Sequence, residues 1–170
     1  MHRPKNGKIL RYTALIGFVF VIYVLQSMVF THLEVWGTKP LLLPLAAVSI
    51  GLYEGSQRGA VMGLIAGIFC DLSFNQPTVD FTLFLTVIGF LSGILFERYL
   101  DDGFPSFIAV SAMVLVLSAF VQFFSLLIYQ DVPFMSLLKT AFIQTVYSMI
   151  FVWPIYHLCR IIGRILYRKF

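Results

Sequence analysis

The chain has 170 residues, of which 59% are hydrophobic and only 12% are charged. Soluble domains average roughly 45–50% apolar and about 25% charged residues. The 12 basic and 8 acidic side chains are too few to cover a water-soluble globule. A mean hydropathy of +0.91 also excludes a disordered chain. We therefore expect an integral membrane protein.

The net charge of +4 is concentrated at the two ends of the chain. The basic residues there are Arg3, Lys5, Lys8, Arg11, Arg160, Arg164, Arg168 and Lys169. Basic residues gather on the cytoplasmic side of membrane proteins. Because no basic stripe is interleaved with exposed aromatic residues, we expect no nucleic-acid partner.

Apolar runs long enough to form helices follow one another along the chain. They cover residues 12–30, 41–53, 59–70, 81–96, 104–129 and 134–158. A bilayer core of roughly 30 Å requires about 20 residues per helix. The first run is too long for a signal peptide and lacks a cleavage site, so we expect it to be retained. The second and third are short and form either two short helices or a re-entrant hairpin. Pro154 predicts a kink in the sixth.

The basic residues also predict the topology. With six spans and alternating connections, ten basic residues lie on one side, while only Lys39 and Lys139 lie on the other. This asymmetry places both termini in the cytoplasm, although it does not separate two short spans from a hairpin. We predict an all-α integral membrane protein of the bacterial cytoplasmic membrane, with one compact six-helix domain over residues 1–170.

Cysteine and histidine residues indicate neither a disulfide nor a metal site. Cys70 and Cys159 fall at opposite ends of their runs, too far apart for a disulfide. His32 is placed outside and His157 inside, so no three or four ligands cluster as zinc requires. We expect no metal and no cofactor.

The clearest pattern is glycine at every fourth position, which we call the glycine ladder: Gly51, Gly55, Gly59, Gly63 and Gly67. In lipid, small residues let helix backbones approach closely, and this drives association. The favoured interpretation is packing of the ladder against a neighbouring helix. A face formed by Thr82, Thr86, Gly89 and Gly93 is its natural mate. The other interpretation is that part of the ladder docks a partner protein.

Carboxylates near the membrane are the next candidates for a site. Asp71 extends the ladder by one more step, and either caps a helix end or forms the buried polar anchor of a partner or ligand site. Glu54 lies four residues before Arg58, and this spacing favours a small interfacial ion pair.

Amides and hydroxyls gather toward the predicted outer side. Gln26, Gln122 and Gln144 lie in the outer parts of three spans, and Ser118 and Ser125 share a helical face with Gln122. Hydrogen bonds between helices are the favoured interpretation. The alternative is an outward-open polar cavity for a small molecule or peptide.

Motifs of catalysis are not evident in the sequence. We find no nucleophile–histidine pair at plausible depth, no HExxH motif, no phosphate-binding loop and no facing pair of central carboxylates. We therefore expect that the protein is not an enzyme. A lipid-modifying activity that depends on Asp71 is the weakest alternative.

The segment with Pro40, Pro44, the glycine ladder from Gly55 to Asp71, and Gly89 and Gly93 resembles the rod shape-determining protein MreD family. Length, hydropathy and basic ends are similar as well. The resemblance implies a non-enzymatic membrane component of bacterial cell-wall elongation. It also implies direct binding to the bitopic protein MreC and links to MreB filaments and to the glycan polymerase and transpeptidase of the complex.

Under this resemblance the glycine ladder and Asp71 become candidates for docking between helices. The chain is also similar to the substrate-binding membrane subunits of energy-coupling factor transporters, which have six helices. That likeness implies a solute-binding subunit as the alternative function, with the outer glutamines and serines as its pocket.

Overall fold

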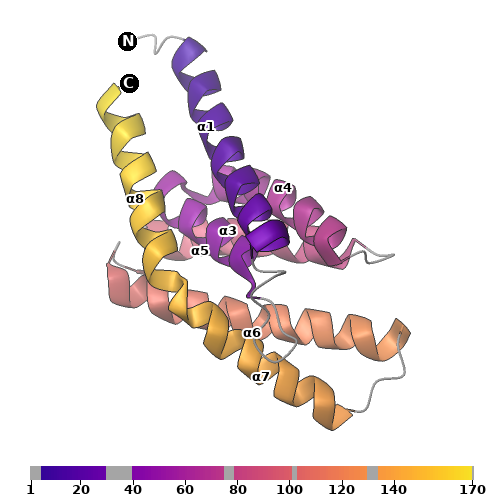
Figure 1. The fold of residues 1–170 in the computed structure, drawn as a ribbon. Helices are drawn as coiled ribbons and strands as arrows, with labels where there is room; N and C mark the ends of the chain where they lie inside the picture. The colour runs from indigo at the N-terminus through magenta and orange to yellow at the C-terminus, as the bar shows by residue number, and fades with distance from the viewer. Residues whose placement is uncertain (1–4, 30–39, 75–78, 101–102, 130–133, 170) are drawn as a thin grey trace.

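The computed structural model describes residues 5–29, 40–74, 79–100, 103–129 and 134–169. Its elements are α1 (Lys5–Val24), the π-helical segment η1 (Leu25–Val29), α3 (Leu42–Glu54), α4 (Ser56–Phe74), α5 (Asp80–Arg98), α6 (Phe104–Tyr129), α7 (Phe134–Ile150) and α8 (Val152–Lys169). No strand occurs in these ranges, and the predicted all-α class is confirmed. Figure 1 shows that α1 begins and α8 ends on the same side of the molecule.

Helix α3 lies at the centre of the fold. Every residue from Leu41 to Leu52 is buried, and α3 packs against α1, α4, α5, α6 and α8. A helix that is apolar on all sides requires apolar surroundings on all sides. Its 13 residues extend about 20 Å, well short of a bilayer core of roughly 30 Å. Helix α3 is therefore an internal element that five other helices surround.

Helices α4 and α5 form an antiparallel pair with the most extensive contact of any two elements. Helix α4 extends beyond its apolar run at both ends, from Ser56 to Phe74. The polar residues on either side of the predicted run 59–70 are thus part of α4, and they contact the ends of neighbouring helices. The α4–α5 pair packs against α3 on one side (Figure 1).

The predicted kink near Pro154 is confirmed. Helices α7 and α8 meet at an angle of 44° across a break at Phe151. Proline has no main-chain N–H, so it cannot donate to the carbonyl four residues earlier, at Ile150. The helix resumes when the N–H of Ile155 donates to the carbonyl oxygen of Phe151 at 3.1 Å.

Among the described residues, three helices are long and apolar enough to cross a membrane: α1 with η1 over Arg11–Met28, α5 over Asp80–Arg98, and α6 over Phe104–Gln122. The bent pair α7–α8 makes a fourth if it is counted as one span. Helix α3 is apolar but short. The structure therefore supports a membrane protein. The total of six spans stays a prediction, as does the crossing of the membrane by the two short runs, 41–53 and 59–70.

Candidate functional site

The glycine ladder faces α5 at the distance of direct backbone contact. A Cβ atom added at Gly59 would meet the carbonyl oxygen of Gly89, and one at Gly63 would meet that of Leu85. At Gly67 the added atom would meet the Cα atom of Thr82. No side chain fits between the two helices, so only glycine permits this approach.

The matching positions on α5 are equally close. A Cβ atom at Gly89 would meet the carbonyl oxygen of Gly59, and one at Gly93 would meet the backbone of Ser56. Gly51 of α3 faces the same strip of α5, with its added Cβ 3.1 Å from the Gly93 nitrogen. The structure therefore brings the ladder together with the Thr82–Gly93 face, and α5 covers the ladder.

Gly55 has a separate role at the turn between α3 and α4. Its φ of +86° lies in the left-handed region, which side chains with a Cβ rarely adopt. Its N–H donates to the carbonyl oxygen of Gly51 at 3.1 Å. This residue reverses the chain so that α4 returns beside α3.

Asp71 caps the beginning of α5. Its Oδ1 accepts the N–H of Phe81 at 3.1 Å, and its Oδ2 accepts the N–H of Thr82 at 2.9 Å and the Thr82 hydroxyl at 2.5 Å. The residue is only 9% exposed. A carboxylate at a helix N-terminus satisfies free N–H groups and interacts favourably with the helix dipole. Asp71 therefore links α4 to α5 through charge-assisted hydrogen bonds.

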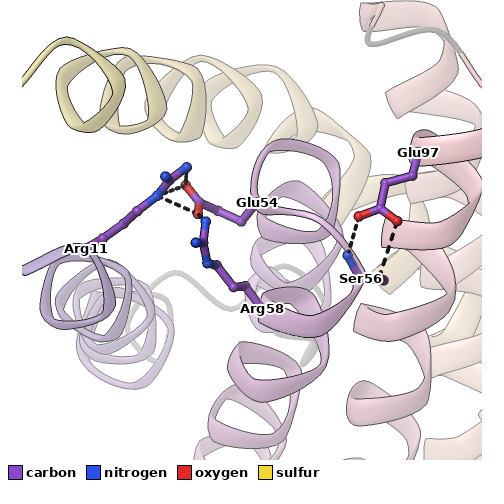
Figure 2. A network of polar contacts seen from close by, with 5 residues as sticks. All are labelled: Arg11, Glu54, Ser56, Arg58 and Glu97. Atoms are coloured by element: carbon purple, nitrogen blue, oxygen red, sulfur yellow. Dashed lines mark hydrogen bonds and ion pairs between the residues drawn. The ribbon is translucent and has the colours of Figure 1, made fainter. Parts of the chain in front are cut away.

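Glu97 makes the reciprocal contact at the opposite end of the pair. It lies in the last turn of α5, and its Oε1 accepts the N–H of Ser56 at 3.0 Å at the start of α4 (Figure 2). Its Oε2 contacts the Ser56 hydroxyl at 3.4 Å. Sequence reasoning missed Glu97. The available signal was an acidic residue at a helix C-terminus, where its own helix dipole disfavours it.

Glu54 joins three helices at the same end of the molecule. Its side chain is 1% exposed and lies 2.7 Å from Nε of Arg11 on α1 and 2.8 Å from Nη1 of Arg58 on α4 (Figure 2). The predicted Glu54–Arg58 ion pair is confirmed, and Arg11 is an addition that sequence spacing did not reveal. A buried carboxylate needs such partners because desolvation of its charge is costly.

Gln26 and Ser148 cap the beginning of α3. The Oε1 atom of Gln26 accepts the N–H groups of Leu42 and Leu43 at 3.0 and 3.1 Å. The N–H of Leu41 donates to the Ser148 hydroxyl at 2.8 Å. Gln26 is 3% exposed, so these bonds lie inside the protein. They satisfy the N–H groups that the start of a buried helix leaves without partners.

The other residues of the predicted polar cavity have different surroundings. Ser118 donates to the carbonyl oxygen of Val114 in its own helix at 2.8 Å, and Gln144 is 3% exposed. The Oε1 atom of Gln122 is buried without a hydrogen-bond partner. Ser125 lies in α6, but its side chain lies outside the described residues. Of the predicted cavity residues whose side chains are described, none lines the groove of about 760 Å³ between α6 and α7.

The helix-capping and ion-paired side chains described above therefore hold helices together. At each end of the α4–α5 pair, a carboxylate of one helix accepts a backbone N–H of the other. Glu54 of α3 is in addition ion-paired with Arg11 of α1. The described residues contain no group of three or more histidine, cysteine, aspartate or glutamate side chains suited to a metal ion. Cys70 and Cys159 are both buried free thiols. These contacts between helix ends restrain the helices relative to one another.

The family model for rod shape-determining protein MreD matches residues 7–162 of the chain. This range includes Arg11, the glycine ladder and both capping carboxylates. Comparisons with curated proteins and with solved structures gave no match.

Proposed function

The chain belongs to the MreD family of rod shape-determining membrane proteins, and from this premise we propose that it is a non-enzymatic scaffold of the cell-wall elongation complex. In this role it maintains rod shape by binding an MreC-like bitopic protein through its helices. MreB filaments and the glycan polymerase and transpeptidase of the complex associate with it indirectly.

The observation that supports a scaffold is the α4–α5 pair with its two interhelical caps. Asp71 and Glu97 bind the backbone at opposite ends of the pair, and glycines bring the two backbones into contact between them. A pair held at both ends and along its length resists sliding and bending. Such a unit presents a fixed surface to other membrane helices.

Partner helices would meet the lipid-facing sides of this pair. Because α5 covers the glycine ladder, the ladder acts by fixing the pair. Exposed apolar residues occur on both helices, including Leu64 and Ile68 of α4 and Val87 and Leu91 of α5. Without a hydrophobic drive between helices in lipid, association depends on shape, and shape requires a rigid surface.

The proposed topology keeps both termini in the cytoplasm. Its support is that Arg11 and Arg58 are both ion-paired with Glu54. The distribution of basic residues predicts that these two arginines lie on the same side of the membrane. Basic residues at one end of the molecule favour the cytoplasmic side.

Depletion of the protein in rod-shaped cells tests the function. Loss of rod shape with unchanged nutrient uptake is the expected result. Loss of uptake with retained shape would instead favour the solute-binding alternative. The contacts of Gln26 count against that alternative, because its amide oxygen is already bonded to the backbone of α3.

Photo-crosslinking tests helix-mediated binding. A photoreactive residue at Ile68 or Val87 should capture the MreC-like protein in intact cells. The matched control is a photoreactive residue at Met62, which is apolar and fully buried in the same helix as Ile68. If neither exposed position captures the protein while inserted levels are normal, the proposed docking face on α4–α5 is wrong.

A further inference from the structure

Helix α8 has an apolar side that is buried and a polar side that is exposed. The helix runs along one side of the molecule and packs against α3 and α6 (Figure 1). Its buried side includes Ile155 and Cys159. Its exposed side carries Trp153, His157 and Arg160, which we call the α8 stripe. Their spacing of four and then three residues places them on one face of the helix.

The α8 stripe differs from the other exposed helix faces of the protein. Every exposed residue in the range 83–95 of α5 and in the range 108–120 of α6 is apolar, as contact with lipid requires. The stripe also lies within a candidate span, because the second half of the bent α7–α8 pair covers Val152–Gly163. Ionisable residues within a span normally face other protein groups. An exposed stripe with histidine and arginine therefore indicates a surface that another protein covers.

His157 lies deeper than the polar end of the helix bundle. A Cβ atom added at Gly163 would lie 3.9 Å from the Cβ atom of Tyr53, the residue before Glu54. His157 precedes Gly163 by six residues, so it lies about 9 Å further from that end. Its ring centre is 4.7 Å from that of Trp153, and its Nδ1 is 3.2 Å from the Trp153 carbonyl oxygen. Both contacts turn the imidazole away from the end where lipid headgroups would lie.

Two groups of the stripe are available for a polar partner. Within the part of the chain that the structure describes, no hydrogen bond or ion pair joins His157 or Arg160 to another helix. Because Nδ1 of His157 faces the carbonyl of its own helix, Nε2 is left for an external contact. The guanidinium of Arg160 is always charged and fits a carboxylate with two parallel N–H groups. The stripe is therefore complementary to an acidic group.

We propose that the α8 stripe docks a membrane-spanning helix of another protein that carries a carboxylate at the depth of His157 and Arg160. The carboxylate pairs with the Arg160 guanidinium and forms a hydrogen bond with Nε2 of His157. Apolar residues of the same helix pack on Trp153 and Ile161, which are both exposed. This surface is separate from the docking face on α4–α5 and does not depend on the function proposed for it.

A second copy of this chain fits the stripe less well than a different protein. The described carboxylates lie at helix ends. Glu54 is buried between two arginines, Asp71 caps α5, and Glu97 accepts the N–H of Ser56. Asp80 lies at the other end of α5 from Glu97. None of these four carboxylates lies within the middle of a span, where the stripe requires its partner.

Binding of synthetic membrane-spanning peptides to the full chain tests the proposal. The protein is placed in phosphatidylcholine vesicles with Trp36→Phe, which leaves Trp153 as the one remaining tryptophan. The probes are dansyl-labelled leucine–alanine helices with either glutamate or leucine six residues inside one end. Energy transfer from Trp153 to the dansyl group reports binding at the stripe. We expect the glutamate peptide to bind about tenfold more tightly, which is the size of one polar contact between helices in lipid.

Substitutions of exposed residues identify the groups that cause this preference. His157→Leu and Arg160→Leu should each reduce it to about threefold, and the double variant should abolish it. The control Arg98→Leu removes an exposed charge at the end of α5 and should keep the full preference. All three positions are exposed, so the thermal midpoint of unfolding should stay unchanged.

Three results would overturn the proposal. The first is equal binding of the two peptides, and the second is an equal loss of preference with Arg98→Leu. The third is displacement of the glutamate peptide by phosphatidylglycerol or by a dimer of the chain that His157→Leu dissociates, which would identify a lipid or a second copy as the occupant.

Discussion

Replacement of Asp71 by alanine should destabilise the protein by removing the cap on α5. The variant leaves the N–H groups of Phe81 and Thr82 without their acceptors. A lost helix cap costs about 0.5–2 kcal/mol, and a buried donor left without a partner costs about 1–3 kcal/mol. Because these effects overlap, we expect a loss of about 3 kcal/mol in the free energy of unfolding. For a chain of this size that corresponds to about 6–12 °C in the thermal midpoint.

Two variants separate the hydrogen bonds from the charge. Asp71→Asn keeps one acceptor oxygen but loses the charge, so about half of the loss is expected. Asp80→Asn removes the same charge from the first turn of α5, where the side chain is exposed. The helix dipole alone contributes about 0.3–1 kcal/mol at such a position. The expected order of damage is therefore Asp71→Ala, then Asp71→Asn, then Asp80→Asn.

The buried thiols provide the assay. Cys70 and Cys159 are inaccessible in the fold, so a thiol-reactive fluorophore labels them as the protein unfolds during a temperature scan in detergent. Recovery of intact protein by size-exclusion chromatography after heating gives a second midpoint, which is needed because Cys70 adjoins the substitution. If Asp71→Ala shifts both midpoints no more than Asp80→Asn, the interhelical cap does not stabilise the fold.

Further outcomes follow from the other contacts and use the same two midpoints. Gly63→Ala should cost about 1–3 kcal/mol because the added methyl group meets a main-chain carbonyl of α5. The control Gly17→Ala has open space around it and should be neutral or stabilising by up to about 1 kcal/mol, so equal losses would contradict the tight-contact explanation. Arg11→Gln should cost about 3 kcal/mol, since it leaves the buried carboxylate of Glu54 with one arginine. Combining it with Glu54→Gln should cost less than the sum of the two single changes, and strict additivity would refute the coupling. Gln26→Leu should cost about 2 kcal/mol, because it leaves two N–H groups at the start of α3 without their acceptor. Gln26→Glu keeps an acceptor oxygen and should cost less.

The helices were predictable because lipid imposes a simple rule on sequence. A spanning helix must be apolar over its length, so the predicted run 104–129 has the bounds of α6. The predicted run 59–70 is shorter than α4, because Arg58 and Asp71 interrupt the apolar pattern while continuing the helix. Local composition detects apolar surface, but it cannot show that a polar side chain has its partner on another helix.

The candidate site was predictable in part for the same reason. The fourfold spacing of glycines indicates a helix face for close contact, and Glu54 and Arg58 are close enough along one chain segment to pair. By contrast, Arg11 lies 43 residues from Glu54, and Glu97 lies 41 residues from Ser56. No local spacing in the sequence encodes such contacts, because the two residues come together only when the chain has folded.

Gln26 illustrates the difference between a residue type and its role. Its place in an apolar run predicts that the amide avoids lipid and seeks a polar partner. Two interpretations, hydrogen bonds between helices and a polar cavity, were open from the sequence. In the structure its oxygen accepts two main-chain N–H groups of α3. A main-chain group as partner has no signature in the amino-acid sequence.

The sequence by itself determined that the protein belongs in a lipid membrane, that it is helical, and which family it belongs to. These depend on the number and order of apolar, basic and glycine residues, which folding does not change. Only the tertiary structure decided which helix the glycines contact, and that Asp71, Glu97 and Gln26 satisfy the first N–H groups of α5, α4 and α3. The physical reason is that main-chain N–H groups at a helix start are the same in every sequence. Which side chain reaches them depends on how the helices pack.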